Sequence, residues 1–217
     1  MTYINLINLD LKTFTLQDAS DYCQLNNLNP LNILKLNLSI NKLTDISGIK
    51  LFKNLKYLNI GYNENYLKDI SVFKYLNNLE FLNLNDNQLT DISVISNLNN
   101  LEFLNLNDNQ LTDISVISNL KNLEELYLNN NKITDISILK DLKNLKYLDL
   151  NRNKIKNLSV FKYLKNLKWL DISRLELESD QIQYLKNLKN LQTLISIKAF
   201  KNMSVLNKLN NNIIKIK

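Results

Sequence analysis

Histidine is absent from this 217-residue sequence, and glycine, proline and cysteine are nearly absent, with two, one and one copies. Without histidine there is no imidazole base or imidazole metal ligand, and the isolated Gly48 and Gly61 cannot build a glycine-rich phosphate loop. Cys23 has no partner for a disulfide and no histidine to activate it, so we interpret it as a buried structural thiol. These absences exclude most common catalytic chemistries, and we expect no enzyme activity, no cofactor and no metal.

The start of the chain also lacks the features of an export signal. Residues 1–10 contain no positive charge, no uninterrupted apolar run and no small-residue cleavage site. No stretch of about 18 uninterrupted apolar residues occurs either. We therefore expect a cytoplasmic protein without a membrane partner, while a signal already removed from a mature chain would leave no trace.

Positive charge is in excess, with 27 Lys and Arg against 21 Asp and Glu. A basic surface can bind nucleic acid by releasing counterions from the phosphates. The lysines are dispersed along the sequence, however, at segments where solvated turns are expected, among them Lys50, Lys74, Lys121, Lys143 and Lys165. We therefore do not expect nucleic acid as the partner and keep it only as an alternative.

What the sequence does contain is a repeat. Residues 79–100 and 101–122 differ only at Asn99 and Lys121. A period of 20 to 50 residues is the mark of a solenoid, in which each coil packs only against its neighbours. The same leucine frame begins at eight residues, separated by 22 residues except for two intervals of 24: Ile33, Leu55, Leu79, Leu101, Leu123, Leu145, Leu167 and Leu191.

Each unit opens with the pattern L-x-x-L-x-L-x-x-N-x-L, whose alternation is typical of a short strand. Counted from the first residue of this frame, positions 4 and 6 face the core, and positions 3, 5 and 7 face the other way. About 13 residues remain for the return leg. They are too few for a long helix, so we expect a 3-10 or single-turn α segment there.

Polar residues mark the turns that follow each strand. An Asp-Ile-Ser segment in five units indicates capping of the return leg. The two longer units carry extra residues at 64–67 and 176–180, which we expect to bulge as loops on the rim. Asparagine stands at position 9 of six units, where its amide can satisfy backbone groups of neighbouring coils: Asn41, Asn63, Asn87, Asn109, Asn131 and Asn153.

The two ends of the repeat array should be closed by caps, because an end coil would otherwise expose its leucines. Thr15 is placed to N-cap a helix that ends near Pro30. In the last two units position 9 is not asparagine but Leu175 and Ala199. We therefore assign residues 1–32 to an N-terminal helical cap, 33–190 to seven repeats, and 191–217 to the last repeat and a C-terminal cap that frays over 210–217.

The leucine frame, the asparagine position and the Asp-Ile-Ser segment together resemble the 22-residue class of leucine-rich repeats, shared by the internalins and the nuclear regulatory subunit of protein phosphatase 1. The resemblance covers residues 33 to about 206. It implies an α/β solenoid, a right-handed horseshoe with a concave parallel sheet of short strands and 3-10 or short helical convex legs. Family members often have proline after the serine, where this chain has Gly48 or an aliphatic residue, which favours more α-like legs.

Position 3 supplies a column on the outward side of the predicted sheet, and five of its eight residues are aromatic. Aromatic side chains are enriched at the centres of protein interfaces. Acidic residues accompany the column in the middle coils and basic residues in the later coils, a pattern that orients a complementary partner. In the family, partners bind this concave face. The candidate partner-binding residues from positions 3 and 5 are Tyr57, Phe81, Phe103, Glu125, Tyr127, Tyr147, Asp149, Trp169 and Asp171.

The resulting hypothesis is a monomeric, non-catalytic module that binds another protein, either as an intracellular adaptor or as an internalin-like surface ligand. The aromatic residues also suit a pleated surface on which they stack with cross-strand neighbours. A structural repeat protein without a dedicated partner is therefore an alternative. Oxygen atoms of Asp86, Asp108 and Asn130 could hold a hard cation, but solvated side chains on a sheet face explain them without a metal.

Overall fold

The computed structural model of the chain describes residues 2–63, 67–209 and 214–216. Within this part of the chain, strands and short helical segments alternate, with one of each in most coils. The strands form a single parallel sheet of ten strands in the order of the sequence. They are β1 (Thr2–Asn5), β2 (Ile33–Asn37), β3 (Tyr57–Asn59), β4 (Phe81–Asn83), β5 (Phe103–Asn105), β6 (Glu125–Tyr127), β7 (Tyr147–Asp149), β8 (Trp169–Asp171), β9 (Thr193–Ile195) and β10 (Ile214–Ile216).

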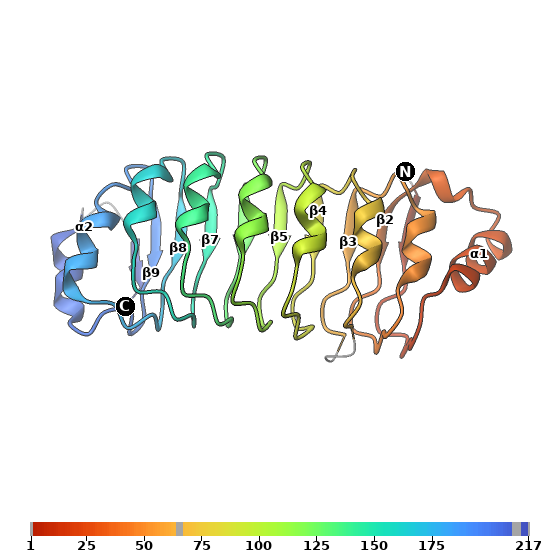
Figure 1. Cartoon of the computed structure of the whole chain (residues 1–217), viewed down its shortest axis with the longest axis horizontal. Coiled ribbons are helices and arrows are strands. Elements are labelled where there is room, and N and C mark those ends of the chain that lie inside the picture. Colours follow the sequence, from red (N-terminus) through yellow and green to blue (C-terminus); the bar gives the residue numbers. More distant parts are fainter. Residues whose placement is uncertain (1, 64–66, 210–213, 217) are drawn as a thin grey trace.

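The helical segments form a second layer, which lies in front of the sheet in Figure 1. The α-helices are α1 (Leu16–Leu25) and α2 (Ile182–Leu185). The 3-10 segments are η1 (Pro30–Asn32), η2 (Ser47–Leu51), η3 (Ser71–Tyr75), η4 (Ser93–Asn97), η5 (Ser115–Asn119), η6 (Ser137–Asp141), η7 (Ser159–Tyr163), η8 (Ser179–Gln181) and η9 (Met203–Lys208). This two-layered coil confirms the leucine-rich-repeat solenoid predicted from the sequence.

The return legs η2 to η7 are all 3-10 segments of five residues, although the proline that often follows the serine in such repeats is missing. Each leg is closed by short-range bonds: in η4 the Ile95 N–H donates to the Ile92 carbonyl at 3.0 Å. The Asp-Ile-Ser segment starts the leg, since Asp91 Oδ1 accepts the Ser93 N–H at 2.7 Å. A more α-like leg, which the missing proline favours, is therefore not adopted in these coils.

The second of the two longer units departs from our expectation. Residues 176–180 were predicted to bulge as a loop on the rim, but Leu177 is buried and bridges to Phe200 in the next coil. The extra length instead enlarges the convex leg, where η8 runs directly into α2. Burial of Leu177 explains why this segment follows the coil. The extra residues of the first longer unit, 64–67, fall largely outside the described residues.

The core combines the leucine and isoleucine residues at positions 1, 4, 6 and 11, stacked on their counterparts in the next coil, with apolar residues of the convex legs such as Phe52 and Phe73. Leu82, Leu104 and Leu126, for example, are cross-strand partners and have no solvent exposure. Burial of such a side chain contributes about 1.5–3 kcal/mol relative to leaving it exposed. The inward positions predicted from the alternation are confirmed.

The asparagine at position 9 ties neighbouring coils together as predicted. Asn109 Nδ2 donates to the carbonyls of Leu84 and Leu106, both at 3.0 Å, and its Oδ1 accepts the Leu89 N–H at 2.7 Å. Two of these partners belong to the preceding coil. Asn87 keeps its donor bonds, but its Oδ1 has no partner among the described residues, because the preceding coil is one of the longer units.

The N-terminal segment contains the predicted helix and also a strand. Thr15 caps α1, and Thr15 and Asp18 form a reciprocal capping box. Ahead of the helix, β1 pairs in parallel with β2. The N-terminal end of α1 lies close to η2: a Cβ on Gly48 would lie 2.3 Å from the carbonyl oxygen of the N-cap residue Thr15. Glycine at this position, where other coils have valine or isoleucine, therefore lets the segment dock.

At the other end, β10 pairs in parallel with β9. The expected fraying is therefore wrong for residues 214–216, because this segment completes a sheet edge with ladder hydrogen bonds. Residues 210–213 and 217, which belong to the same prediction, lie outside the described residues.

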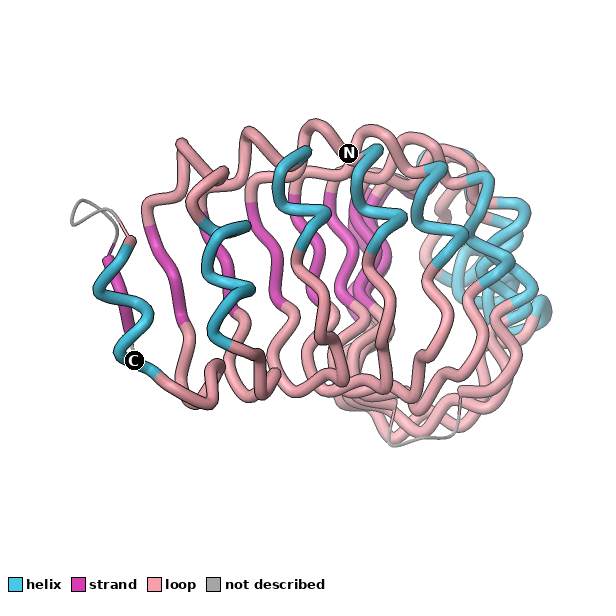
Figure 2. The backbone as a smooth tube through the Cα atoms, turned by 60° about the vertical axis from the view of Figure 1, so that its left-hand side comes forward, coloured by secondary structure: helices cyan, strands magenta, loops and turns pink. Residues whose placement is uncertain are grey.

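The stack curves so that the sheet lies on its inner side. Figure 2 shows the strands as one wall of the coil and the helical legs as the other. Strands in a sheet are about 4.8 Å apart, whereas the stacked rings that rise from β4 and β5, Phe81 and Phe103, have centroids 4.1 Å apart. Groups above the sheet thus converge, as expected on a concave surface.

Candidate functional site

The position 3 column predicted from the sequence is a continuous row in the structure. Its residues are direct Cα partners across seven adjacent strand pairs, from Lys35 on β2 to Thr193 on β9. Most of these side chains are half-buried, and Tyr147 is 36% exposed. The sheet therefore brings together residues that lie 22 or 24 positions apart in the sequence.

In the N-terminal half of the column, three aromatic rings stack on one another. The ring centroids of Tyr57 and Phe81 are 4.1 Å apart, and those of Phe81 and Phe103 are also 4.1 Å apart, with interplanar angles of 14° and 9°. We call Tyr57, Phe81 and Phe103 the ring stack. Burial raises the pKa of the Tyr57 hydroxyl. Each ring covers the face of the next, so the ring stack offers mainly ring edges to solvent.

The C-terminal half of the candidate site is chemically different. Here position 3 supplies Glu125, Tyr147 and Trp169, and position 5 supplies Tyr127, Asp149 and Asp171 from the same three strands, β6, β7 and β8. We call these six residues the acidic-aromatic cluster. The Tyr127 hydroxyl donates to Glu125 Oε2 at 2.9 Å. Burial and this neighbouring carboxylate raise the pKa of Tyr127, so the hydroxyl keeps its proton.

Position 5 has a structural role that the sequence analysis did not recognise. In four coils an asparagine there accepts the backbone N–H of the residue two places further on: Asn37, Asn59, Asn83 and Asn105. Asp149 Oδ1 and Asp171 Oδ1 accept the same bond from Asn151 and Ser173, at 3.0 and 2.8 Å. The recurrence of Asn and Asp at this position was the signal in the sequence.

Tyr127 and Ile195 are the two residues at position 5 that are neither Asn nor Asp, and the Tyr127 side chain cannot reach back to accept the N–H of Asn129. That N–H instead donates to Asn107 Oδ1 of the preceding coil at 2.6 Å. The aromatic side chain is thus accommodated by a bond between coils, which frees Tyr127 to lie over Glu125 and against Phe103, with ring centroids 5.4 Å apart.

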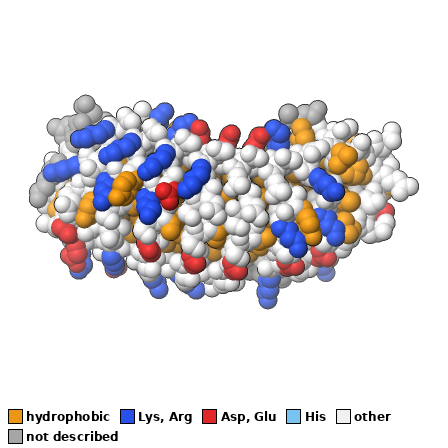
Figure 3. Space-filling view, turned by 45° about the horizontal axis from the view of Figure 1, so that its top comes forward, with side chains coloured by type: hydrophobic (Ala, Val, Ile, Leu, Met, Phe, Trp, Pro, Cys, Tyr) orange, Lys and Arg blue, Asp and Glu red, His pale blue; other side chains and the backbone are white. Residues whose placement is uncertain are grey.

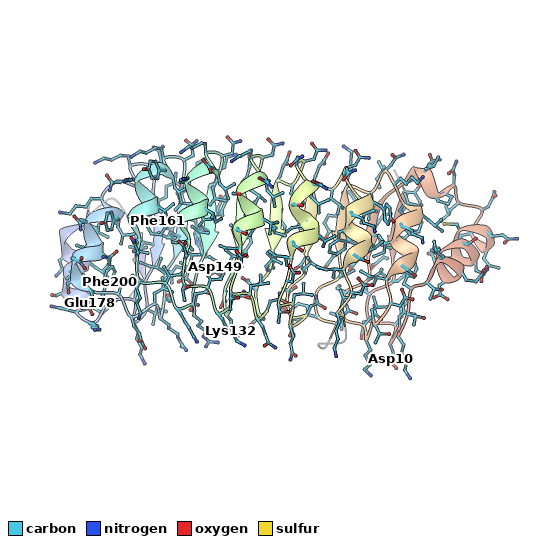
Figure 4. All side chains as sticks on the ribbon, in the orientation of Figure 1. Asp10, Lys132, Asp149, Phe161, Glu178 and Phe200 are labelled. Atoms are coloured by element: carbon cyan, nitrogen blue, oxygen red, sulfur yellow. The ribbon has the colours of Figure 1, made fainter. Side chains whose placement is uncertain are left out.

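Asp149 carries the most perturbed carboxyl group of the site. The residue is 7% exposed, and Figure 4 marks it within the strand layer. Burial raises its pKa to about 6; the Asn151 N–H acts in the opposite direction, and the charges of Asp171 and Asp108 add to the increase. A negative charge at this place is therefore poorly compensated by the chain itself.

Charged residues of opposite sign flank the two halves of the sheet. Position 8 has a left-handed backbone in every coil from Ile40 to Lys198. This position carries Asp86 and Asp108 in the middle coils, and Arg152 and Arg174 further on. Position 2 adds ion pairs between neighbouring coils, Lys56 with Glu80 and Glu124 with Lys146, both at 2.6 Å.

At position 8, one acidic side chain is bonded to the next coil. Asn130 Nδ2 donates to Asp108 Oδ1 at 2.7 Å, so an amide satisfies one oxygen of this carboxylate. Among the described residues, no group of three or more His, Cys, Asp or Glu side chains is placed to hold a metal ion. Nor does any described helix have the length and apolar character needed to cross a membrane.

Lysines also gather on the rim where the convex legs lead into the next strands. Figure 3 shows Lys and Arg side chains clustered over the C-terminal half of the face in view. Lys121, Lys143 and Lys165 recur every 22 residues at position 21, and the coil stacks them into a ridge. The Nζ atoms of Lys143 and Lys162 lie 5.0 and 4.9 Å from the Tyr163 ring centroid. Lysines dispersed in the sequence are therefore not dispersed in space.

Comparison with known proteins agrees with this architecture. A family profile described as Leucine Rich repeats (2 copies) matches residues 77–119 and 121–163. A comparison with curated proteins finds no match.

Solved structures with the same fold include proteins of two bacteria. Internalin C2 of Listeria monocytogenes is 26% identical, with a TM-score of 0.69 over 98% of this chain and 79% of its own. Another internalin of that species is 25% identical, with a TM-score of 0.62 over 89% of this chain and 69% of its own. A leucine-rich-repeat protein of Leptospira interrogans is 25% identical, with a TM-score of 0.71, and this chain spans 59% of its length.

Proposed function

This chain is a leucine-rich-repeat protein that resembles the internalins, and from this premise we infer that it is a non-catalytic module that binds another protein on the concave face of its sheet. Proteins with this fold commonly mediate protein–protein interaction. The observation that carries the proposal is the alignment of the position 3 column across β2 to β9, with aromatic rings at five of eight places.

Two features of the column support a binding role over simple packing. First, the acidic-aromatic cluster is not a closed stack, because Tyr147 stays 36% exposed. Second, buried carboxylates stand beside the aromatic rings, and stacking of rings on cross-strand neighbours does not require them. In the ring stack of Tyr57, Phe81 and Phe103, in contrast, the ring faces already cover one another. We therefore place the centre of the binding surface on β6, β7 and β8.

An internalin-like ligand fits better than an intracellular adaptor, because two of the three structures compared are internalins. The chain is similar to those proteins along nearly its whole length. An export signal or an anchor in the complete reading frame would support the internalin-like version.

The test is partner capture with and without three rings of the column. We expect the triple variant Phe103→Ala, Tyr147→Ala and Trp169→Ala to bind its partner with more than tenfold lower affinity, since large aromatic side chains dominate interface energies. Circular dichroism should show an intact fold. The matched control replaces Tyr75 and Tyr163, exposed aromatic residues of the convex legs η3 and η7, with Ala. Capture of the same partners by wild type and triple variant would refute the concave site.

The lysine ridge gives the nucleic-acid alternative a place on the molecule, and that alternative has its own test. Binding to duplex DNA should be measured by fluorescence anisotropy at about 50 mM salt, where phosphate contacts are strong. We expect no binding under these conditions. Binding that weakens steeply with added salt, and that survives the triple variant, would favour nucleic acid over a protein partner.

A further inference from the structure

Two carboxylates in the acidic-aromatic cluster perform a task that four other coils accomplish without charge. Asp149 and Asp171 each accept the backbone N–H two residues further on, as the asparagines at position 5 of β2 to β5 do. An amide oxygen is therefore sufficient for the fold at this position. The negative charge must be explained by something other than the turn.

The charge is also costly where it stands. Asp149 and Asp171 are each 7% exposed and are direct cross-strand partners, at a strand spacing of about 4.8 Å. Burial and mutual repulsion raise the pKa of Asp149. Among the described residues neither carboxylate takes part in an ion pair. A buried charge without a partner destabilises a protein.

Each carboxylate keeps one oxygen available. Only Oδ1 of Asp149 and of Asp171 accepts a hydrogen bond among the described residues. The second oxygens are not among the fully buried atoms that lack a partner, so they keep contact with solvent on the concave side of the sheet, where position 5 lies. Two such acceptor oxygens on neighbouring strands suit a ligand group that can donate a hydrogen bond to each of them.

Aromatic residues occupy the neighbouring positions of the same part of the sheet. Tyr147 and Trp169 occupy position 3 of the same strands, and Tyr127 occupies position 5 of the strand before. A cation near the face of Tyr or Trp is attracted by the ring quadrupole. The combination of two carboxylate oxygens with aromatic walls is complementary to a guanidinium group, which is planar, carries five N–H donors and stacks on rings.

We propose that the acidic-aromatic cluster binds an arginine side chain of the partner protein, with the guanidinium group between Asp149 and Asp171. This rests on the proposed function and names the chemistry of its central contact. The same coils place Lys146 and Lys168 at position 2, and Arg152 and Arg174 at position 8. Because these cations flank the carboxylates, the partner segment around the arginine should be acidic rather than basic.

Trp169 makes the proposal directly measurable, because it is the only tryptophan of the chain and lies in the cluster. The probe is a synthetic seven-residue peptide with a central arginine between glycines and two glutamates at each end. We expect a saturable change in Trp169 fluorescence with this peptide. A peptide with citrulline, a neutral analogue of arginine of the same shape, should give no change, and a peptide with lysine should bind at least fivefold more weakly.

The decisive variant is Asp149→Asn with Asp171→Asn, which keeps both backbone bonds and removes both charges. It should bind the arginine peptide at least tenfold more weakly, because two charge-assisted hydrogen bonds are lost. The matched control is Asp91→Asn with Asp113→Asn. These exposed carboxylates also accept the backbone N–H two residues on, but they lie at η4 and η5, so binding should not change.

Three results would overturn the proposal: no response to the arginine peptide, equal binding by wild type and the Asp149/Asp171 variant, or equal binding of the arginine peptide and either substitute. Its failure is distinguishable from failure of the proposed function. If the triple aromatic variant loses its partner while the arginine peptide does not bind, the concave face is the binding surface but the arginine assignment is wrong.

Discussion

At the scale of single residues, position 5 shows how one place in the repeat serves two purposes. Its side-chain oxygen closes the turn after the strand, and either Asn or Asp can supply it. The charge of Asp149 and Asp171 is then available for a partner. The alternation in the sequence predicts that these residues face outward. The hydrogen bond from the backbone N–H two residues further along the chain depends on the backbone conformation of the turn, which the sequence pattern does not give.

The substitution Asp149→Asn should stabilise the protein at neutral pH. The pKa of this carboxyl in the folded state is about 6, above its ordinary value of 3.8, so folding favours the protonated form. The stabilisation by that proton is complete below the ordinary pKa and is lost as the pH rises through the folded-state pKa. A shift of roughly two pKa units corresponds to about 3 kcal/mol at most.

Urea unfolding of wild type and Asp149→Asn at several values between about pH 4 and pH 7 measures this effect. The free energy of unfolding of the wild type should fall relative to the variant across the window. The exposed Asp91→Asn serves as control and should show no such trend. A difference between Asp149→Asn and wild type that is constant with pH would rule out a raised pKa.

At the scale of strands and turns, the sequence predicted the elements well because each is encoded locally. The leucine alternation places the strands, and the asparagine at position 9 places the turn. The convex legs were less certain, since a short apolar segment suits a 3-10 turn and an α turn equally. The five residues Ser93–Asn97 form the tighter turn, and the α-helical turn of α2 occurs in a coil that is two residues longer.

The asparagine ladder should contribute more to stability than any exposed amide. We expect Asn109→Ala to lower the free energy of unfolding by about 2–4 kcal/mol, because the buried Leu89 N–H loses its partner and the carbonyls of Leu84 and Leu106 each lose one of two bonds. The control Asn122→Ala removes one exposed bond, from Nδ2 to the Asn99 carbonyl, and should cost about 1 kcal/mol or less. Chemical denaturation of both variants checks this, and equal losses would mean that the ladder has no special role.

At the scale of the whole molecule, the ends and the surface charge were harder to predict than the coils. The N-terminal cap was expected to be helical, and β1 was missed because a single edge strand without a full repeat gives little periodic signal. The lysine ridge was missed because residues 22 positions apart seem unrelated in a linear chain. The solenoid converts that interval into contact between neighbours, so any type of residue kept at one position becomes a stripe.

The docking of the N-terminal cap depends on Gly48. Since a Cβ at this place would lie 2.3 Å from the Thr15 carbonyl oxygen, Gly48→Ala should displace the start of α1 and cost about 1–3 kcal/mol. The equivalent position in an inner coil is Val94. Hydrogen exchange of the α1 amides should therefore accelerate in Gly48→Ala and stay unchanged in the control Val94→Ala. Unchanged protection of α1 in both variants would show that the close approach is not needed.

The two nearly identical coils, residues 79–100 and 101–122, lie between the first ring, Tyr57, and the acidic-aromatic cluster. Because their strands present the same edges to their neighbours, one coil can be removed or duplicated without creating a new junction. Each such step moves the N-terminal and C-terminal halves of the concave face by about 4.8 Å relative to each other. The number of these coils therefore sets the distance between the two contact regions of the concave face, and it leaves the residues of both regions unaltered.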